Sequence, residues 1–236
     1  MAGITDGKFA LQLIPYGFDT VTIGGYNTDS KTIEAGEKIL KRGRNEFNIP
    51  EADLITTIGN EVEIIKDKYD VEVSANLRAT TPDPILEISK IKNLDIIELN
   101  FHCRQHEILK INCGQSMLEN IEFLETFTRE IVKKSKSKVS VKIRANVEGT
   151  DTLKIAKIIE KVKADYLHID AMKPGFNHAD LDIIKKIANE TEIFLIGNNS
   201  ITSIDRCKKM LHAGASGISI GRAAINGKLN FDFAKI

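Results

Sequence analysis

The stretch Glu-Leu-Asn-Phe-His-Cys-Arg-Gln-His, residues 98–106, places a thiol among amide, imidazole and guanidinium groups. Asn100 closes a predicted strand, and Cys103 follows in the loop just beyond it. Neighbouring cationic groups such as His102 and Arg104 favour the thiolate form of a cysteine and raise its reactivity. The stretch therefore predicts a reactive cysteine at a strand end.

Basic side chains are expected on the inner face of two further strands. In Val-Lys-Ile-Arg, residues 141–144, Lys142 and Arg144 share one side because side chains alternate along a strand. Buried cations need anions or electron-rich ligand atoms beside them, so these two contact a ligand or form salt bridges with Glu98 or Asp170. His168, in Tyr-Leu-His-Ile-Asp, is either a ligand contact or an interior histidine with its ring nitrogens paired.

Two turns rich in small residues follow the last predicted strands, in residues 196–201 and 217–224. Small residues let backbone N–H groups approach a phosphate, and an arginine adds a charge-assisted contact. The alternative is a pair of tight turns with Arg222 in a surface ion pair. We expect a phosphate to be surrounded by Asn198, Asn199, Gly221 and Arg222.

Short β-branched runs alternate with longer amphipathic stretches, which is typical of repeated βα units with a parallel sheet. The predicted strands are Phe18–Gly24, Val71–Leu77, Leu94–Asn100, Val139–Arg144, Tyr166–Asp170, Ile193–Gly197 and Gly217–Ile220. The predicted helices include Ser30–Arg44, Asn120–Lys134, Asp151–Lys163, Ala179–Glu190 and Ile204–Ala213.

The length of 236 residues suits one α/β barrel of the TIM (β/α)₈ type, and no linker divides the chain. We therefore expect a single domain over residues 1–236. Seven strands are predicted, and the residues 1–6 read as a loop. The first barrel strand is thus expected to be missing or truncated, or the start site has been placed too late. Strand-end loops form the active site of such barrels, so the polar residues above should converge.

Composition restricts the classes of protein to consider. The 33 basic and 33 acidic residues balance to a net charge of zero, which argues against a large nucleic-acid footprint. No apolar run is long enough to span a membrane, and no signal peptide is evident. The cysteines, Cys103, Cys113 and Cys207, form neither a disulfide framework nor, with His106, a standard zinc pattern. We expect a cytoplasmic protein with reduced thiols and no metal.

In this order, the segments resemble the dihydrouridine synthase family of flavin enzymes. Residues 1–6 and Phe9 are similar to that family's opening loop. Asn100 and Cys103 match its Asn-x-Gly-Cys-Pro loop, with His102 and Arg104 in place of Gly and Pro. The further matches are Lys110, Gly114, residues 141–144, His168, Asn198, Asn199, Gly221 and Arg222, although Ile169 and Asp170 replace the Gly-Arg that follows the family's histidine.

The resemblance implies a barrel that binds FMN across its mouth, with Lys142 near the pyrimidine end of the flavin ring. Asn100 and His168 are then further cofactor contacts, and Cys103 is the acid that exchanges a proton with a substrate carbon. The implied reaction is hydride transfer to or from a C=C bond of a pyrimidine-like substrate, either a small molecule or a nucleotide. The chain is expected to lack the family's C-terminal tRNA-binding domain, which argues with the zero net charge against a tRNA substrate.

Two other functions fit the same residues. The segment Ile-Glu-Leu-Asn-Phe-His-Cys is also similar to the Asn-x-x-Cys-Pro segment of dihydroorotate dehydrogenases, which predicts an oxidoreductase of a free small molecule. The opening residues 1–6 favour the first family. A non-catalytic barrel that binds a phosphorylated ligand or a partner protein is the alternative from another class.

Overall fold

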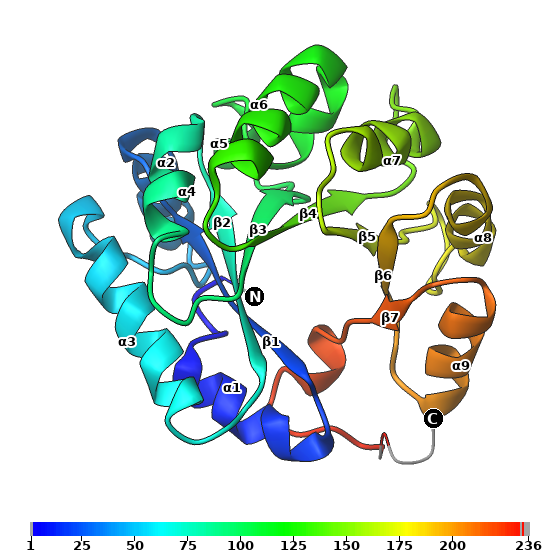
Figure 1. Cartoon of the computed structure of the whole chain (residues 1–236), viewed down its shortest axis with the longest axis horizontal. Helices are drawn as coiled ribbons and strands as arrows, with labels where there is room; N and C mark the ends of the chain where they lie inside the picture. The colour runs from blue at the N-terminus through cyan, green and yellow to red at the C-terminus, as the bar shows by residue number, and fades with distance from the viewer. Residues whose placement is uncertain (1, 232, 234–236) are drawn as a thin grey trace.

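The computed structural model describes residues 2–231 and 233, so Met1 and the last part of the predicted domain lie outside the described residues. Parallel strands form one sheet in chain order, and helices cover its outer side (Figure 1). The strands are β1 Thr20–Asn27, β2 Glu72–Arg78, β3 Ile96–Phe101, β4 Lys138–Arg144, β5 Tyr166–Asp170, β6 Phe194–Asn198 and β7 Gly217–Ile218. The α-helices are α1 Gly7–Leu13, α2 Ser30–Lys41, α3 Leu54–Lys66, α4 Pro82–Ile88, α5 His106–Leu109, α6 Ile121–Lys134, α7 Thr152–Lys161, α8 Leu181–Glu190 and α9 Ile204–His212.

The sheet curls into a barrel wall that stays open between β1 and β7 (Figure 1). The described residues supply seven strands of the eight-stranded pattern, which confirms the predicted α/β barrel class. In the part of the chain that the structure describes, no helix is long and apolar enough to cross a membrane.

Side-chain alternation divides each strand between the core and the barrel interior. On β4 the apolar Val141 and Ile143 are fully buried on the side that packs against helices. Ser140, Lys142 and Arg144 lie on the opposite side and contact residues of neighbouring strands. The sheet therefore presents a polar inner face opposite its apolar core.

Parallel register arranges the polar inner residues in levels. One level holds Asn100, Lys142 and His168. The next level toward the strand ends holds Arg144, Asp170 and Asn198. Polar groups from neighbouring strands consequently meet at the carboxyl end of the sheet, where α/β barrels carry their active sites.

The predicted strands overlap the observed ones, with ends that differ by at most three residues. The largest difference is in β1, which continues past Gly24 to Asn27. The opening loop leads into α1, which was not predicted and whose first turn is capped by Asp6 through a 2.7 Å bond from the Phe9 backbone N–H. The start of this helix is marked by a single capping residue, which the periodicity of apolar residues does not reveal.

Ile97 on β3 tests the apolar side of the sheet. Its side chain is fully buried, whereas Ile55 on α3 is 49% exposed. We expect Ile97→Ala to lower the free energy of unfolding by about 2–5 kcal/mol through the cavity it leaves. Ile55→Ala removes the same atoms at the surface and should change it by less than about 0.5 kcal/mol. Urea denaturation of both variants measures this, and equal effects would contradict the assigned strand face.

Candidate functional site

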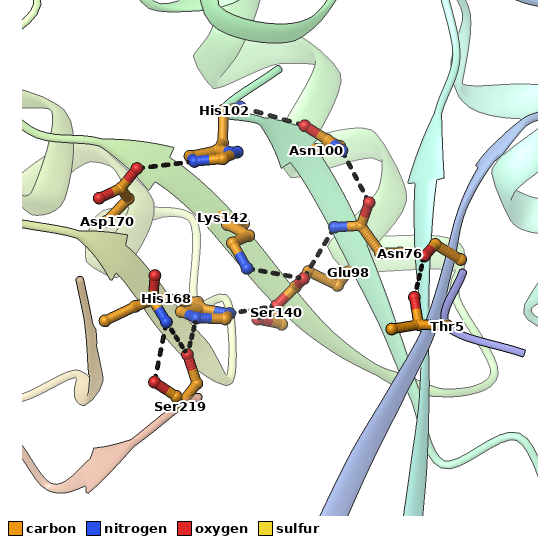
Figure 2. Close-up of polar contacts among 12 residues, drawn as sticks. Thr5, Asn76, Glu98, Asn100, His102, Ser140, Lys142, His168, Asp170 and Ser219 are labelled. Carbon is orange, nitrogen blue, oxygen red and sulfur yellow. Dashed lines mark hydrogen bonds and ion pairs between the residues drawn. The ribbon is translucent and has the colours of Figure 1, made fainter. Parts of the chain in front are cut away.

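The buried carboxylate of Glu98 lies at the centre of the inner face (Figure 2). Its Oε1 accepts a 2.7 Å hydrogen bond from Asn76 Nδ2, and its Oε2 lies 2.6 Å from His168 Nδ1. Ser140 Oγ also donates to Oε2 at 3.3 Å. Burial favours the neutral acid, but His168, the Lys142 ammonium and the Asn76 amide outweigh it and hold the pKa of Glu98 below its usual range. Glu98 is therefore ionised at neutral pH.

His168 is buried with a partner at each ring nitrogen. Burial and the nearby Lys142 charge lower its pKa, so the ring is neutral at pH 7. Its Nδ1–H then donates to Glu98, and Ser219 Oγ–H donates to Nε2 over 2.5 Å. Asn198 Nδ2 in turn donates to Ser219 Oγ at 2.8 Å. Both ring nitrogens of His168 are therefore paired within the protein.

Lys142 and Arg144 both point into the barrel, as the alternation on their strand predicts. Arg144 Nη1 donates to Asp170 Oδ2 at 2.8 Å, which is a close ion pair. Lys142 Nζ lies 3.9 Å from Glu98 Oε1, at the outer limit of an ion pair, and its side chain is 20% exposed. The salt-bridge alternative therefore describes Arg144 well, whereas the Lys142 ammonium keeps N–H donors for a ligand.

Asp170 joins the ends of three strands. Besides Arg144, it accepts from His102 Nε2 at 2.7 Å and from Asn199 Nδ2 at 2.6 Å. Burial would raise its pKa, but these hydrogen bonds and the Arg144 charge hold it below the usual range. The pKa of His102 is lowered because burial outweighs its bond to Asp170. His102 is thus neutral and turned to Asp170 (Figure 2), and it supplies no cation to Cys103.

The Cys103 loop is held by a side-chain amide. Asn100 Oδ1 accepts from the backbone N–H groups of His102 at 3.2 Å and Cys103 at 2.9 Å. Asn100 Nδ2 donates to Asn76 Oδ1 at 2.7 Å, and Asn76 donates onward to Glu98. Two amides thus connect the Cys103 loop to the central carboxylate. Asn76 was not predicted, although its place on the inner face of Val71–Leu77 was the available signal.

Among the cysteines, Cys103 alone is partly exposed, while Cys113 and Cys207 are buried. Cys113 Sγ donates to the Ala79 carbonyl at 3.4 Å, and burial raises its pKa to about 12. Cys207 is a fully buried core residue of α9. Cys103 is therefore the thiol that a ligand over the strand ends can reach.

The sequence also did not reveal the cation that does reach Cys103. Arg78 ends β2, and its Nη1 lies 3.7 Å from Cys103 Sγ. The same guanidinium is buried and forms an ion pair with Glu46. Glu46 lies in an irregular segment 32 residues earlier in the chain, so no spacing in the sequence connects the two.

The two predicted phosphate turns lie at the ends of neighbouring strands, β6 and β7. Asn198 and Asn199 direct their amides to Ser219 and Asp170, so their side chains are engaged within the protein. Within the described residues, the Asn199 and Gly221 backbone N–H groups have no protein acceptor, and the exposed Arg222 forms no ion pair. A Cβ placed on Gly221 would meet nothing within 4 Å. These free donors beside open space suit an anion.

The chain matches the family model described as dihydrouridine synthase (Dus) over residues 54–229. That range contains each residue predicted to bind cofactor or to act in catalysis.

Three curated relatives differ in how much of each chain is matched. An uncharacterized protein of Methanocaldococcus jannaschii is 36% identical, over 98% of this chain and 89% of that protein. The tRNA-dihydrouridine synthase B of Pasteurella multocida is 27% identical over 61% of this chain and 46% of its own length. The catalytic subunit of dihydroorotate dehydrogenase B (NAD(+)) of Shouchella clausii is 31% identical over 66% of this chain and 59% of its own length. The chain thus spans roughly half the length of these two enzymes.

Among solved structures, the (S)-3-O-geranylgeranylglyceryl phosphate synthase of Thermoplasma acidophilum superposes with a TM-score of 0.53 at 13% identity. The match covers 93% of this chain and 79% of that one. At this identity the likeness concerns the fold alone.

Replacement of Asp170 tests the strand-end network through its pH dependence. Its folded pKa lies below its ordinary value of 3.8, so the unfolded chain binds more protons near pH 4. The stabilisation from Asp170 is therefore present above about pH 4 and is lost as the pH falls. We expect Asp170→Asn to lower the free energy of unfolding at pH 7 by about 1.5–3 kcal/mol, with a smaller difference at pH 2–3.

Urea denaturation at several pH values measures this difference. Asp182→Asn, at a side chain that is 94% exposed, serves as the control and should change the free energy of unfolding by less than about 0.5 kcal/mol. A difference between Asp170→Asn and the wild type that grows as the pH falls would contradict the sign derived above.

Proposed function

Because the chain belongs to the dihydrouridine synthase family, we propose that it is an FMN-dependent oxidoreductase that acts on a C=C bond of a pyrimidine-like substrate. The observation that carries the proposal is the arrangement of Asn100, Lys142 and His168 at one level of the inner face, below the Cys103 loop. These groups come from three adjacent strands and meet where α/β barrels bind their ligands.

The residues present fit the two ends of FMN. The Lys142 ammonium, with its loose contact to Glu98, suits the electron-rich pyrimidine end of a flavin. The free N–H groups of Asn199 and Gly221, together with Arg222, suit its phosphate. We assign Asn198 and His168 to support these contacts, because both bond Ser219. Asn100 holds the loop above them.

Bound FMN would supply the hydride chemistry that no amino-acid side chain provides. Within the chain, Cys103 would hold the proton that is exchanged with a substrate carbon. Asn100 fixes the backbone of that loop, and the neutral His102 adds no positive charge beside the thiol. Three free cysteines among the described residues suit a cytoplasmic protein with reduced thiols, which is part of the same proposal.

The substrate in this proposal is a small molecule or a free nucleotide. The net charge of zero supports it, since proteins that track nucleic acids usually carry a basic excess. A dihydroorotate dehydrogenase-like reaction is the second candidate, because the relative from Shouchella clausii is 31% identical to this chain. Turnover assays with dihydrouridine-containing nucleotides and with dihydroorotate discriminate between the two.

Flavin binding is the first test. We expect the purified protein to be yellow and to release FMN on denaturation, as identified by mass spectrometry. Arg222→Ala should weaken FMN binding by about 1.5–3 kcal/mol because it removes a charged hydrogen bond. Lys142→Met should weaken binding or shift the flavin reduction potential. Lys38→Met, at an exposed lysine of α2, is the control that should leave both unchanged.

Turnover of Cys103→Ala is the second test. The variant should retain FMN and lose turnover by roughly 10²–10⁴-fold, as is typical when a general acid is removed. Cys207→Ala removes the same group from the core of α9 and should leave turnover within a few-fold of the wild type. Full activity in Cys103→Ala would leave a flavin-binding barrel without the proposed acid. A colourless protein without FMN would favour the non-catalytic, phosphate-binding alternative.

A further inference from the structure

Arg78 is a buried cation in direct contact with the candidate acid. Its side chain is 1% exposed, at the end of β2. Nη2 donates to the Gly25 carbonyl at 2.8 Å, and Nη1 lies 3.7 Å from Cys103 Sγ. The hydrogen bond to the Gly25 carbonyl holds the planar guanidinium in place, with Nη1 against the sulfur.

An uncompensated guanidinium at this place would work against the proposed chemistry. A cation beside a thiol stabilises the thiolate, and the effect is strong where water is excluded. A general acid must instead keep its proton until the reaction. The charge of Arg78 therefore has to be neutralised if Cys103 is to act as an acid at neutral pH.

Glu46 supplies the opposite charge. Its side chain is also 1% exposed, and both carboxylate oxygens face Arg78, with Oε1 3.4 Å from Nη1 and Oε2 paired to Nη2. The opening residues pack closely against its backbone, since a Cβ on Gly3 would lie 2.6 Å from the Glu46 nitrogen. The two buried charges form a pair with no net charge beside the thiol.

The other titratable groups around Cys103 do not replace this pair. On its own loop, His102 is neutral and bonded to Asp170, and Arg104 is exposed. Cys113, which packs in the same cluster, keeps its proton because burial raises its pKa to about 12. Asp29, whose charge acts on Cys113, is held by Thr32 and Thr80.

We propose that Glu46 is a positioning residue that keeps Cys103 in its proton-carrying form by neutralising Arg78. Arg78 holds the sulfur, and Glu46 cancels the charge that would otherwise ionise it. The proposal rests on the proposed role of Cys103 as an acid, and it assigns a function to a residue outside every motif of the strand-end site.

Alkylation of Cys103 by iodoacetamide as a function of pH tests the proposal without any turnover. Peptide mass spectrometry on the whole protein separates Cys103 from the buried thiols. Glu46→Gln removes the negative charge but keeps the shape, so half-maximal alkylation should move to lower pH by roughly 1–3 units. Arg78→Gln removes the cation and should move it to higher pH. The double variant should return toward the wild type, because both charges are then absent.

The opposite signs are decisive, since loss of packing alone would move both single variants in the same direction. Glu107→Gln is the matched control, because it removes a carboxylate four residues from Cys103 that pairs with Arg42 instead. Its alkylation profile should follow the wild type, because the Glu107 carboxylate pairs with the half-exposed Arg42 and not with Arg78. Single variants that shift together, or not at all, would overturn the proposal.

Two further measurements keep the outcome clear. If a variant does not fold, the wild type still decides, since its alkylation rate at pH 7 should lie at least roughly tenfold below its alkaline plateau. A plateau already reached at pH 7 would overturn the proposal. Turnover of Glu46→Gln should fall at neutral pH and recover toward lower pH. Opposite alkylation shifts in the Glu46 and Arg78 variants, found together with full turnover of the separate Cys103→Ala variant, would retain the role of Glu46 toward the thiol and reject the acid function itself.

Discussion

The ionised carboxylate of Glu98, buried in the middle of a β-strand, is the constraint on which the inner face depends. A charge in this position is tolerated only because donors and a cation from three neighbouring strands surround it. Asn76 reaches it from β2, Lys142 from β4 and His168 from β5. The requirement to satisfy one carboxylate thus fixes the orientation of three side chains, and through Asn76 and Asn100 it extends to the loop that carries Cys103.

The same requirement sets protonation states. Burial and the Lys142 charge both disfavour a second positive charge on His168. The ring therefore stays neutral and connects Glu98 to Ser219 through its two nitrogens. Nearer the strand ends, Asp170 likewise lies between a cation, Arg144, and a neutral imidazole, His102. Both carboxylates lie beside a cation and accept a hydrogen bond from a neutral imidazole. Such satisfied networks are rigid, which supports the proposal that this surface holds a planar flavin.

Local pattern was enough to predict the fold and the strand-end residues. Alternation placed Lys142 and Arg144 inside, and β5 was predicted with the bounds that it has, Tyr166–Asp170. The partners of these residues could not be predicted, because they depend on register between strands that are 20 to 70 residues apart, as for Asn76 with Glu98 and Glu98 with His168. The Arg78–Glu46 pair was hidden for the same reason, since Glu46 lies outside any periodic element. His102 was expected to act on Cys103, and only the fold shows that it turns to Asp170.

Charge is distributed unevenly over this site although the chain as a whole is neutral. In the interior each cation has an acidic partner: Lys142 with Glu98, Arg144 with Asp170, and Arg78 with Glu46. At the rim, Arg104 and Arg222 are exposed and form no ion pair within the described residues, yet both lie near enough to help lower the pKa of Arg144. Burial is the main cause of that lowering, and the two rim cations add to it. Compensation inside prevents isolated buried charges, and the uncompensated rim cations support the proposed anion site at the free N–H groups of the β6 and β7 turns.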